Sequence, residues 1–237
     1  WGGALTHIVP ESGYWVRVND NMPFTVLGLP TGSSIDYAVH TGNNLLSYSY
    51  DVGQSIQEAL PSDIQSNIFA IFGQNVSALN VNGTWLGSLN SFDPGKGYWF
   101  IASDAFDFTY IPPTPSSARG LIEKEMPLVP DEFAYSQSTK QAFYFIDSIE
   151  GAEEGDWVIS YHNDQVVGAR MWNGQLIDVP AMGEDTQLET LNYCNDGSSV
   201  IFKLFKPSTI SFLLKENFSS TLFNSSSGPS KAAMPPY

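Results

Sequence analysis

The hydrophobic and polar positions of the chain alternate in short stretches, and the first clear stretch lies at residues 45–50 (LLSYSY). Apolar and small polar residues alternate there, which is the pattern of a half-buried strand. Ser55 then precedes Glu58 by three residues, which is the spacing of a capping box. The pattern therefore predicts one short helix that begins after Ser55 and is stopped by Pro61.

The stretch that follows reads as further strands separated by turns. Its apolar positions, which predict another strand, are Ile64, Ile68, Ala70 and Phe72. Asn82-Gly83 is a strong signal for a two-residue hairpin turn, and Trp85 with residues 95–100 (GKGYWF) closes the unit. We expect a mostly antiparallel sheet with one helix packed on it. Its tryptophans and tyrosines are expected chiefly in the core, and a stacking platform for sugar rings is the alternative.

An internal repeat sets the domain organisation of this region. Residues 1–26 align without a gap on residues 85–110, and ten of the 26 positions are identical, including the Gly-Tyr-Trp triplets that begin at Gly13 and Gly97. Self-similarity at a fixed offset indicates repeated structural units. Residues 1–26 are therefore interpreted as the C-terminal part of a repeat module and residues 27–110 as a complete one. On this interpretation the chain opens within a module.

Proline and serine mark the boundaries of the second half. Residues 111–118 (IPPTPSSA) are predicted to be a proline-rich linker, because prolines stiffen and extend the chain. A second domain is expected over residues 119–223. Residues 224–237 (NSSSGPSKAAMPPY) have the composition of a low-complexity tail that is disordered or bound to a partner.

The second domain contains a predicted three-stranded meander. The strands are residues 156–162, 165–172 and 176–179, joined by the turns Asn163-Asp164 and Asn173-Gly174. Placing His162 opposite Gln165 puts two sets of side chains on one face: Trp157, Ile159 and Tyr161, with Val166, Gly168, Arg170 and Trp172. Arg170 then lies across from Trp157. It could stack on an aromatic ring, meet a buried carboxylate or mark a ligand surface, and we favour a structural pair.

Composition and charge restrict the partners. Acidic residues outnumber basic ones 25 to 10, which gives a net charge of −15. Such a chain repels nucleic-acid backbones, so nucleic-acid binding is not expected. The chain lacks a run of about 20 apolar residues, so membrane insertion is not expected either. Cys194 is the single cysteine and is interpreted as a small apolar filler rather than a catalytic thiolate.

Residues that could carry chemistry are few and scattered. The three histidines lack the spacing of a metal site, and the chain has no phosphate-binding glycine loop and no activated-serine motif. Neighbouring acidic residues on loops are usually solvated rather than paired across a cleft. We therefore expect a protein that is not an enzyme and has no cofactor. Calcium is the alternative, because it prefers oxygen ligands; the weak candidates for it are Asp178, Glu184 and Asp185.

Four stretches of the second domain carry a resemblance to a known type of module: residues 135–145 (YSQSTKQAFYF), 155–161 (GDWVISY), 167–172 (VGARMW) and 178–185 (DVPAMGED). Together they resemble a β-sandwich module with a QSTxQAFYF, DWVGAF, VGARxW and DVPAMG pattern. The sequence departs from it at Ile159, Ser160 and Tyr161. Residues 83–89 (GTWLGSL) and 94–100 (PGKGYWF) look like the tandem repeats ending in a GYW strand that stand beside such modules.

Modules that look like these recur in large bacterial surface proteins and in structural proteins of marine viruses, including phages, and they carry no catalytic residues to transfer. The resemblance implies a mainly β fold, with a repeat module and a β-sandwich domain. It also implies an extracellular, cell-surface or virion-surface location and a structural or adhesive function. The expected partners are copies of the chain, other structural chains or glycans.

The competing interpretation is a carbohydrate-binding module of a secreted multi-domain protein, which would expose coplanar aromatic side chains. The candidate ligand-binding residues are Trp157, Tyr161, Arg170, Trp172 and Trp85.

Overall fold

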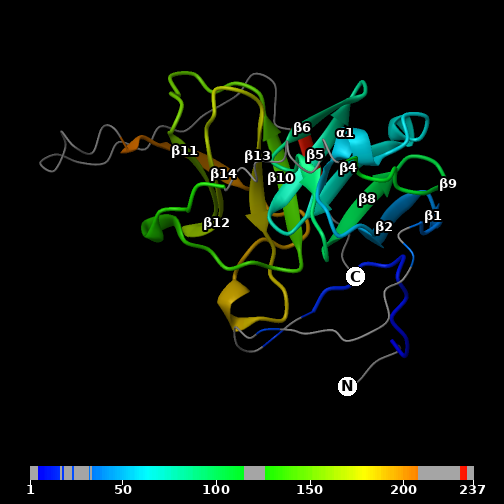
Figure 1. The fold of residues 1–237 in the computed structure, drawn as a ribbon. Coiled ribbons are helices and arrows are strands. Elements are labelled where there is room, and N and C mark those ends of the chain that lie inside the picture. The colour runs from blue at the N-terminus through cyan, green and yellow to red at the C-terminus, as the bar shows by residue number, and fades with distance from the viewer. Residues whose placement is uncertain are drawn as a thin grey trace, which may run out of the picture. The chain divides into compact units, whose positions relative to one another are not determined.

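The computed structural model describes residues 5–16, 18, 23, 32, 34–114, 126–207 and 230–233, and its fold is mainly β (Figure 1). The chain divides into two compact units. The first comprises residues 1–73, 78–85 and 89–123. The second comprises residues 74–77, 86–88 and 124–237, so two short pieces from within the repeat region group with it. Most of the predicted linker, residues 115–118, lies outside the described residues.

The first unit is built on a five-stranded sheet with the order β2-β8-β4-β5-β6, and two smaller strand pairs, β1 with β9 and β3 with β7, accompany it. The elements in chain order are β1 (Tyr37–Val39), β2 (Gly42–Ser47), β3 (Gln54–Ser55), α1 (Ile56–Ala59), a 3-10 helix (Gln65–Asn67), β4 (Ile68–Gly73), β5 (Val76–Val81), β6 (Thr84–Gly87), β7 (Ser91–Phe92), β8 (Gly97–Ala102) and β9 (Phe106–Phe108). β8 is antiparallel to both β2 and β4.

The predicted helix and hairpin turn are both confirmed. The Ser55 hydroxyl accepts a hydrogen bond from the Glu58 N–H at 3.3 Å and donates one to the Glu58 carboxylate at 2.9 Å. α1 ends before Pro61. Asn82 and Gly83 have φ angles of 53° and 86°, which is the left-handed conformation that a two-residue hairpin requires. These features depend on neighbouring residues alone, which is why the sequence predicts them.

Aromatic rings fill the core of the first unit. The Phe92 ring lies 4.9 Å from Tyr98, 5.4 Å from Tyr110 and 5.6 Å from Tyr48, centroid to centroid. These residues are buried, so the prediction that they pack in the core is confirmed for them. Burial raises the pKa of the Tyr48, Tyr98 and Tyr110 hydroxyls, because desolvation disfavours the charged phenolate.

The two copies of the repeat share their local structure. The Val9 N–H donates to the Tyr14 hydroxyl at 2.9 Å, and at the equivalent positions the Asp93 N–H donates to the Tyr98 hydroxyl at 2.8 Å. Each copy also closes a turn by a backbone hydrogen bond: Ser12 N to Val9 O at 3.3 Å, and Lys96 N to Asp93 O at 3.4 Å. The similarity seen in the sequence is therefore also a similarity of backbone conformation in these turns.

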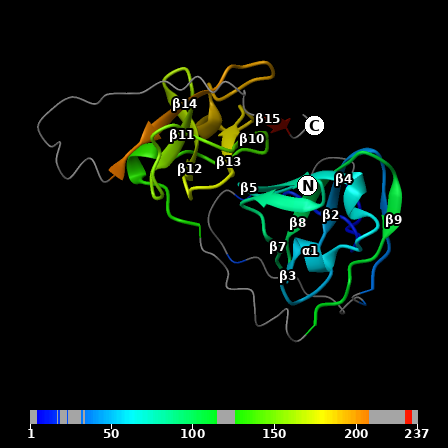
Figure 2. The ribbon, with the colours of Figure 1, turned by 90° about the horizontal axis from the view of Figure 1, so that it is seen from above.

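The second unit contains two antiparallel three-stranded sheets, with the orders β13-β10-β15 and β12-β11-β14 (Figure 2). Its elements are a 3-10 helix (Asp131–Phe133), β10 (Gln141–Ile146), β11 (Trp157–His162), β12 (Gln165–Met171), β13 (Ile177–Met182), a 3-10 helix (Leu188–Thr190), β14 (Ile201–Phe205) and β15 (Ser230–Ala233). The arrangement is consistent with the predicted sandwich.

β11 and β12 form the predicted hairpin, but their register changes along its length. The cross-strand pairs are His162 with Gln165, Tyr161 with Val166, Ser160 with Gly168, Val158 with Arg170 and Trp157 with Met171. Val167 is the extra residue of a β-bulge, which turns every later side chain of β12 to the opposite face. The predicted placement of Arg170 across from Trp157 is therefore wrong, because the alternation was carried through without the bulge.

The meander also ends earlier than predicted. β13 pairs with β10 rather than with β12, so the turn at Asn173-Gly174 leads the chain from one sheet to the other. Four residues of the predicted tail, Ser230–Ala233, form β15 and pair with the other edge of β10. These four residues are therefore part of a sheet in spite of their low-complexity composition. The rest of the predicted tail lies outside the described residues.

The two sheets approach each other closely at Gly168 and Pro180. A Cβ atom built on Gly168 would lie 2.0 Å from the Pro180 carbonyl oxygen, and the Ser160 hydroxyl donates to the same oxygen at 2.6 Å. Only glycine fits at this point of β12.

We expect Gly168→Ala to lower the free energy of unfolding by about 3 kcal/mol, because the added methyl group forces backbone movement between the sheets. The control is Gly197→Ala. Gly197 has a φ of 83° and open space around its Cβ position, so we expect a cost of about 1–2 kcal/mol from its backbone conformation alone. Urea denaturation of both variants measures the difference, and equal costs would contradict the close approach.

Candidate functional site

The structure does not bring the predicted ligand-binding aromatics onto one exposed face. Trp157 and Trp172 are 6% and 5% exposed and pack in separate clusters of the core. Tyr161 is half-buried, and the Lys203 ammonium lies 4.4 Å from the centre of its ring. A cation–π contact thus already occupies one face of that ring. These three residues form no stacking platform.

Trp85 belongs to the first unit and has a different partner. Its indole N–H donates to the Gln65 side-chain oxygen at 3.2 Å. Gln65 is buried, and its amide nitrogen donates to the Leu60 carbonyl oxygen at 2.9 Å. Trp85 therefore hydrogen-bonds to Gln65, whose side chain in turn satisfies the Leu60 carbonyl group at the end of α1. This is a structural role.

Arg170 is the member of the predicted set that joins a polar network. Its Nε donates to the Asp178 backbone oxygen at 2.9 Å and lies 3.5 Å from the Asp178 carboxylate, and its Nη2 donates to the Asn75 backbone oxygen at 2.8 Å. Its Nη1 lies 2.7 Å from the Met126 sulfur. Of the three interpretations of this arginine, the pairing with a buried carboxylate is confirmed.

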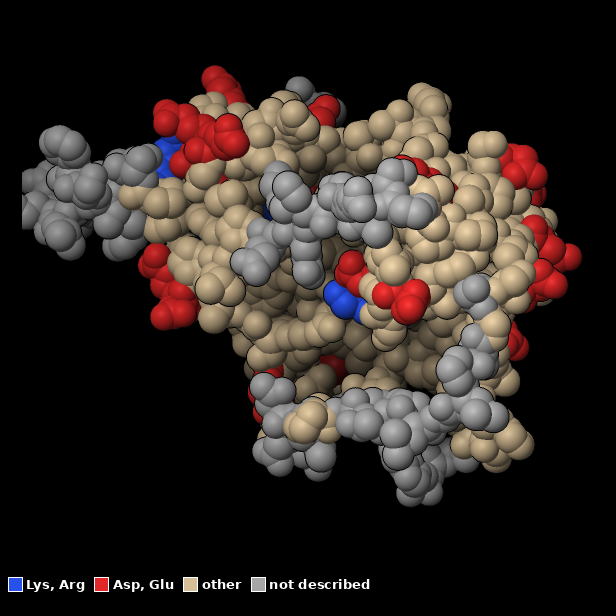
Figure 3. Space-filling model, in the orientation of Figure 1, with Lys and Arg blue, Asp and Glu red and all other residues tan. Residues whose placement is uncertain are grey.

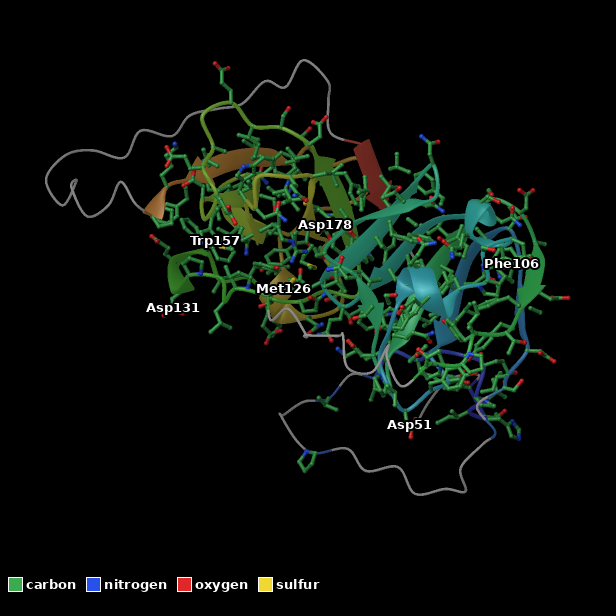
Figure 4. All side chains as sticks on the ribbon, turned by 45° about the horizontal axis from the view of Figure 1, so that its top comes forward. Asp51, Phe106, Met126, Asp131, Trp157 and Asp178 are labelled. Atoms are coloured by element: carbon green, nitrogen blue, oxygen red, sulfur yellow. The ribbon has the colours of Figure 1, made fainter. Side chains whose placement is uncertain are left out.

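Asp178 is the centre of this network and is buried within the second unit (Figure 4). Its Oδ2 accepts hydrogen bonds from the Ser77 N–H at 3.0 Å, the Ser77 hydroxyl at 2.6 Å and the Ser88 hydroxyl at 2.7 Å. These partners could not be identified from the sequence, since Ser77 lies 101 positions away from Asp178. Three donors on one carboxylate oxygen leave it committed to holding residues 74–77 and 86–88.

Asp185 organises a loop in a similar way. Its carboxylate accepts from the Thr190 hydroxyl at 2.7 Å, the Gln187 N–H at 2.8 Å and the Thr139 N–H at 3.1 Å. Burial alone would raise the pKa of this carboxyl, but the hydrogen bonds from Thr190, Thr139 and Gln187 outweigh it and hold the pKa well below the usual range. Glu184 accepts from the Asn192 N–H at 2.9 Å.

These contacts bear on the calcium candidates. Asp178, Glu184 and Asp185 each direct carboxylate oxygens at N–H or O–H donors of the protein. Over the ranges that the structure describes, no group of three or more His, Cys, Asp or Glu residues is placed to hold a metal ion. The three acidic residues therefore do not form a joint cation site there.

The outer edge of β2 is the second candidate site, and the first copy of the Gly-Tyr-Trp motif lies on it. The Gly13 N–H donates to the Leu45 oxygen at 3.0 Å, and the Ser47 N–H donates to the Glu11 oxygen at 3.2 Å. The Ser47 hydroxyl also donates to the Pro10 oxygen. Residues 11–13 thus add an antiparallel segment to the edge of the sheet.

Glycine is required where this segment meets the sheet. A Cβ atom on Gly13 would lie 2.9 Å from Leu45 Cγ, and a Cβ atom on Gly97 would lie 3.0 Å from Gly13 Cα. The equivalent glycines of the two repeat copies therefore face each other without side chains. From the sequence, the first copy could fold back onto the following repeat or complement a neighbouring protomer, and the structure places residues 11–13 on β2 of the same chain.

Comparisons with known proteins identify no relative: no protein-family model matches the chain, and neither a curated protein nor a solved structure is significantly similar to it. The contacts above are therefore the basis for assigning a function.

We expect Asp178→Ala to lower the free energy of unfolding by about 3–5 kcal/mol, because it leaves the Arg170 guanidinium buried without its counter-charge. Ser88→Ala removes a single donor from the same carboxylate and should cost about 1 kcal/mol. Chemical denaturation of both variants measures the two costs. A loss for Asp178→Ala no larger than that for Ser88→Ala would show that the network does not depend on the carboxylate.

The Asp185 carboxylate should make stability depend on pH in the acid range. Its folded pKa is lowered below the unfolded value of about 3.9, so its contribution is complete above that value and is lost as the pH falls toward the folded pKa. At pH 7 we expect Asp185→Asn to cost about 1–3 kcal/mol. The difference from the unmodified protein should shrink between pH 5 and pH 2. Glu189→Gln, an exposed position in the same loop, is the control and should show no such trend.

Proposed function

We propose that this chain is a non-enzymatic structural or adhesive module of an extracellular or virion surface, and that it assembles with further copies of itself or with other structural chains. The observation that carries the proposal is the addition of residues 11–13 to the outer edge of β2. A sheet edge that pairs with a repeat motif is a means of joining units, since strand addition is a general mode of protein association.

The chemistry of this edge supports joining between chains. Two hydrogen bonds to this edge join backbone atoms: the Gly13 N–H donates to the Leu45 oxygen, and the Ser47 N–H donates to the Glu11 oxygen. Any segment with the same turn can make these two bonds. An unpaired strand edge exposes N–H and C=O groups that need partners, and natural proteins either cover such edges or use them for association. The local turn at residues 9–12 forms in both repeat copies, so a segment from another copy would carry the same shape.

Charge and polar contacts also fit a structural role. The chain has a net charge of −15, and acidic side chains are spread over the face in Figure 3 while basic ones are few. A surface of one sign favours solubility of a large surface protein. The Asp178 network is buried and holds chain segments together instead of facing solvent. In the parts of the chain that the structure describes, no helix is both long and apolar enough to cross a membrane.

The alternative, a carbohydrate-binding module, gains no support from the aromatic side chains. Such a module needs planar rings exposed together on one face. Trp157 and Trp172 are buried, Tyr161 is covered on one side by Lys203, and Trp85 is bonded to Gln65. We therefore propose assembly as the function. Glycan recognition remains the alternative, and a glycan array tests it separately.

The assembly proposal predicts a large particle of 26.0 kDa chains in light scattering and native mass spectrometry. We expect Ser47→Pro to reduce its size, because proline removes the N–H that bonds Glu11 on the outer edge of β2. Ser47→Ala keeps this N–H and removes only the hydroxyl bond to the Pro10 oxygen, so we expect it to reduce the particle size less than Ser47→Pro does. A folded monomer at high concentration, with residues 5–16 protected from hydrogen exchange, would overturn assembly between chains.

A further inference from the structure

Two Asn-Gly pairs lie in turns of the chain, Asn82-Gly83 and Asn173-Gly174, and all four residues are exposed. Asparagine before glycine is the pair most prone to lose its side-chain amide. Glycine has no side chain to hinder its own backbone nitrogen as this nitrogen approaches the asparagine Cγ atom. The reacting residues are the same in both pairs, so a difference in their reactivity within the folded chain comes from the fold.

The fold restrains the pair at Asn82. Residues 82–83 are the two-residue turn between β5 and β6, which are neighbours in one sheet. The Gly83 N–H donates to Asn80 Oδ1 at 2.8 Å. The Asn80 amide nitrogen donates to the Gln65 oxygen at 2.7 Å, which fixes the orientation of the Asn80 amide. The Gly83 nitrogen must therefore give up a hydrogen bond before it can attack the Asn82 side chain.

The pair at Asn173 is not restrained in this way. Residues 172–176 lie between β12 and β13 and belong to neither strand. Across the residues that the structure describes, no atom accepts a hydrogen bond from the Gly174 N–H. The space around the Cβ position of Gly174 is also open. Its nitrogen is therefore available as a nucleophile without the loss of a contact.

A second contact prepares the Asn173 side chain for attack. The Gln175 N–H donates to Asn173 Oδ1 at 3.0 Å. When a nucleophile adds to Cγ, negative charge develops on this same oxygen. A backbone N–H that already points at the oxygen stabilises that charge, as the donors of an oxyanion hole do. The turn thus combines a free nucleophile with a polarised carbonyl group.

We propose that Asn173 is a site of spontaneous deamidation and that the fold protects Asn82 from the same reaction. The Gly174 nitrogen loses its proton to solvent and forms a bond to Asn173 Cγ. The bond from Cγ to the side-chain nitrogen breaks, ammonia leaves, and a cyclic imide remains. Water then opens the imide: attack at Cγ gives aspartate, and attack at the backbone carbonyl carbon gives isoaspartate. The reaction consumes one water, releases one ammonia and needs no enzyme.

The modification changes both charge and backbone. Either product adds one negative charge to a chain whose net charge is −15. Isoaspartate also places an extra methylene in the main chain between Trp172 and Ile177. Both of these residues are buried and belong to the same core cluster, so the longer connection between β12 and β13 has fixed ends. This inference is independent of the proposed assembly function.

The test incubates the full chain at mildly alkaline pH in water enriched in heavy oxygen, and peptide mapping by mass spectrometry follows label uptake at both asparagines. We expect Asn173 to react about tenfold faster than Asn82, the factor that corresponds to one hydrogen bond. In concentrated urea the two rates should converge, because the contacts of the folded chain are lost. Equal rates in the folded chain, or a difference that persists unchanged in urea, would overturn the proposal.

Two substitutions test the contacts themselves. Asn80→Ala frees the Gly83 N–H and should raise the rate at Asn82 about tenfold, with no change at Asn173. Gln175→Pro removes the N–H that bonds Asn173 Oδ1 and should slow Asn173, whereas Gln175→Ala keeps this N–H and should react as the unmodified chain does. The melting temperature of each variant checks that it is folded. Unchanged rates in folded Asn80→Ala and Gln175→Pro chains would contradict the role given to these contacts.

The effect on the fold has its own control. Asn173→Gln has a longer side chain that does not readily form the imide. After the same incubation, we expect the melting temperature of the unmodified chain to fall in step with its isoaspartate content, and that of Asn173→Gln to stay constant. An equal fall in both chains would place the damage elsewhere in the molecule and contradict the effect assigned to Asn173.

Discussion

A central strand needs a hydrogen-bonding neighbour on each side, and the first unit is organised by this requirement. β8 satisfies this requirement because it lies between β2 and β4. Its side chains Tyr98 and Phe100 pack against Phe92 in the aromatic core. Residues 13–18 are equivalent to this strand in the first repeat copy, and Gly13 donates instead to the Leu45 oxygen at the outer edge of β2. Neighbouring strands, rather than the motif itself, decide whether these side chains are buried.

The features that sequence reasoning predicted are those determined within a few residues. The capping contact between Ser55 and Glu58 spans one helical turn, and the Asn82-Gly83 turn needs only two left-handed residues. The repeat was visible because identical residues recur at a constant offset. Mainly β structure followed from alternation and from the density of turn signals.

The features that sequence reasoning missed depend on contacts between distant residues. The bulge at Val167 leaves no mark in the alternation, yet it moves Arg170 to the face opposite the predicted one. β13 and β15 both pair with β10, and which strands pair with each other depends on residues far apart in the sequence. The candidate site followed the same rule: a carboxylate partner was among the interpretations of Arg170, but Asp178 and its bonds to Ser77 could be identified only in three dimensions.

The Asp178 network has a consequence for how the chain can be divided. Residues 74–77 and 86–88 belong to the second unit, although they precede the rest of it by more than thirty positions in the sequence. A fragment excised at residue 124 would contain both sheets of the second unit but none of the serines that satisfy Asp178. The unit is therefore discontinuous along the chain, and a fragment cut at the proline-rich stretch would leave the Asp178 carboxylate without its bonds to Ser77 and Ser88.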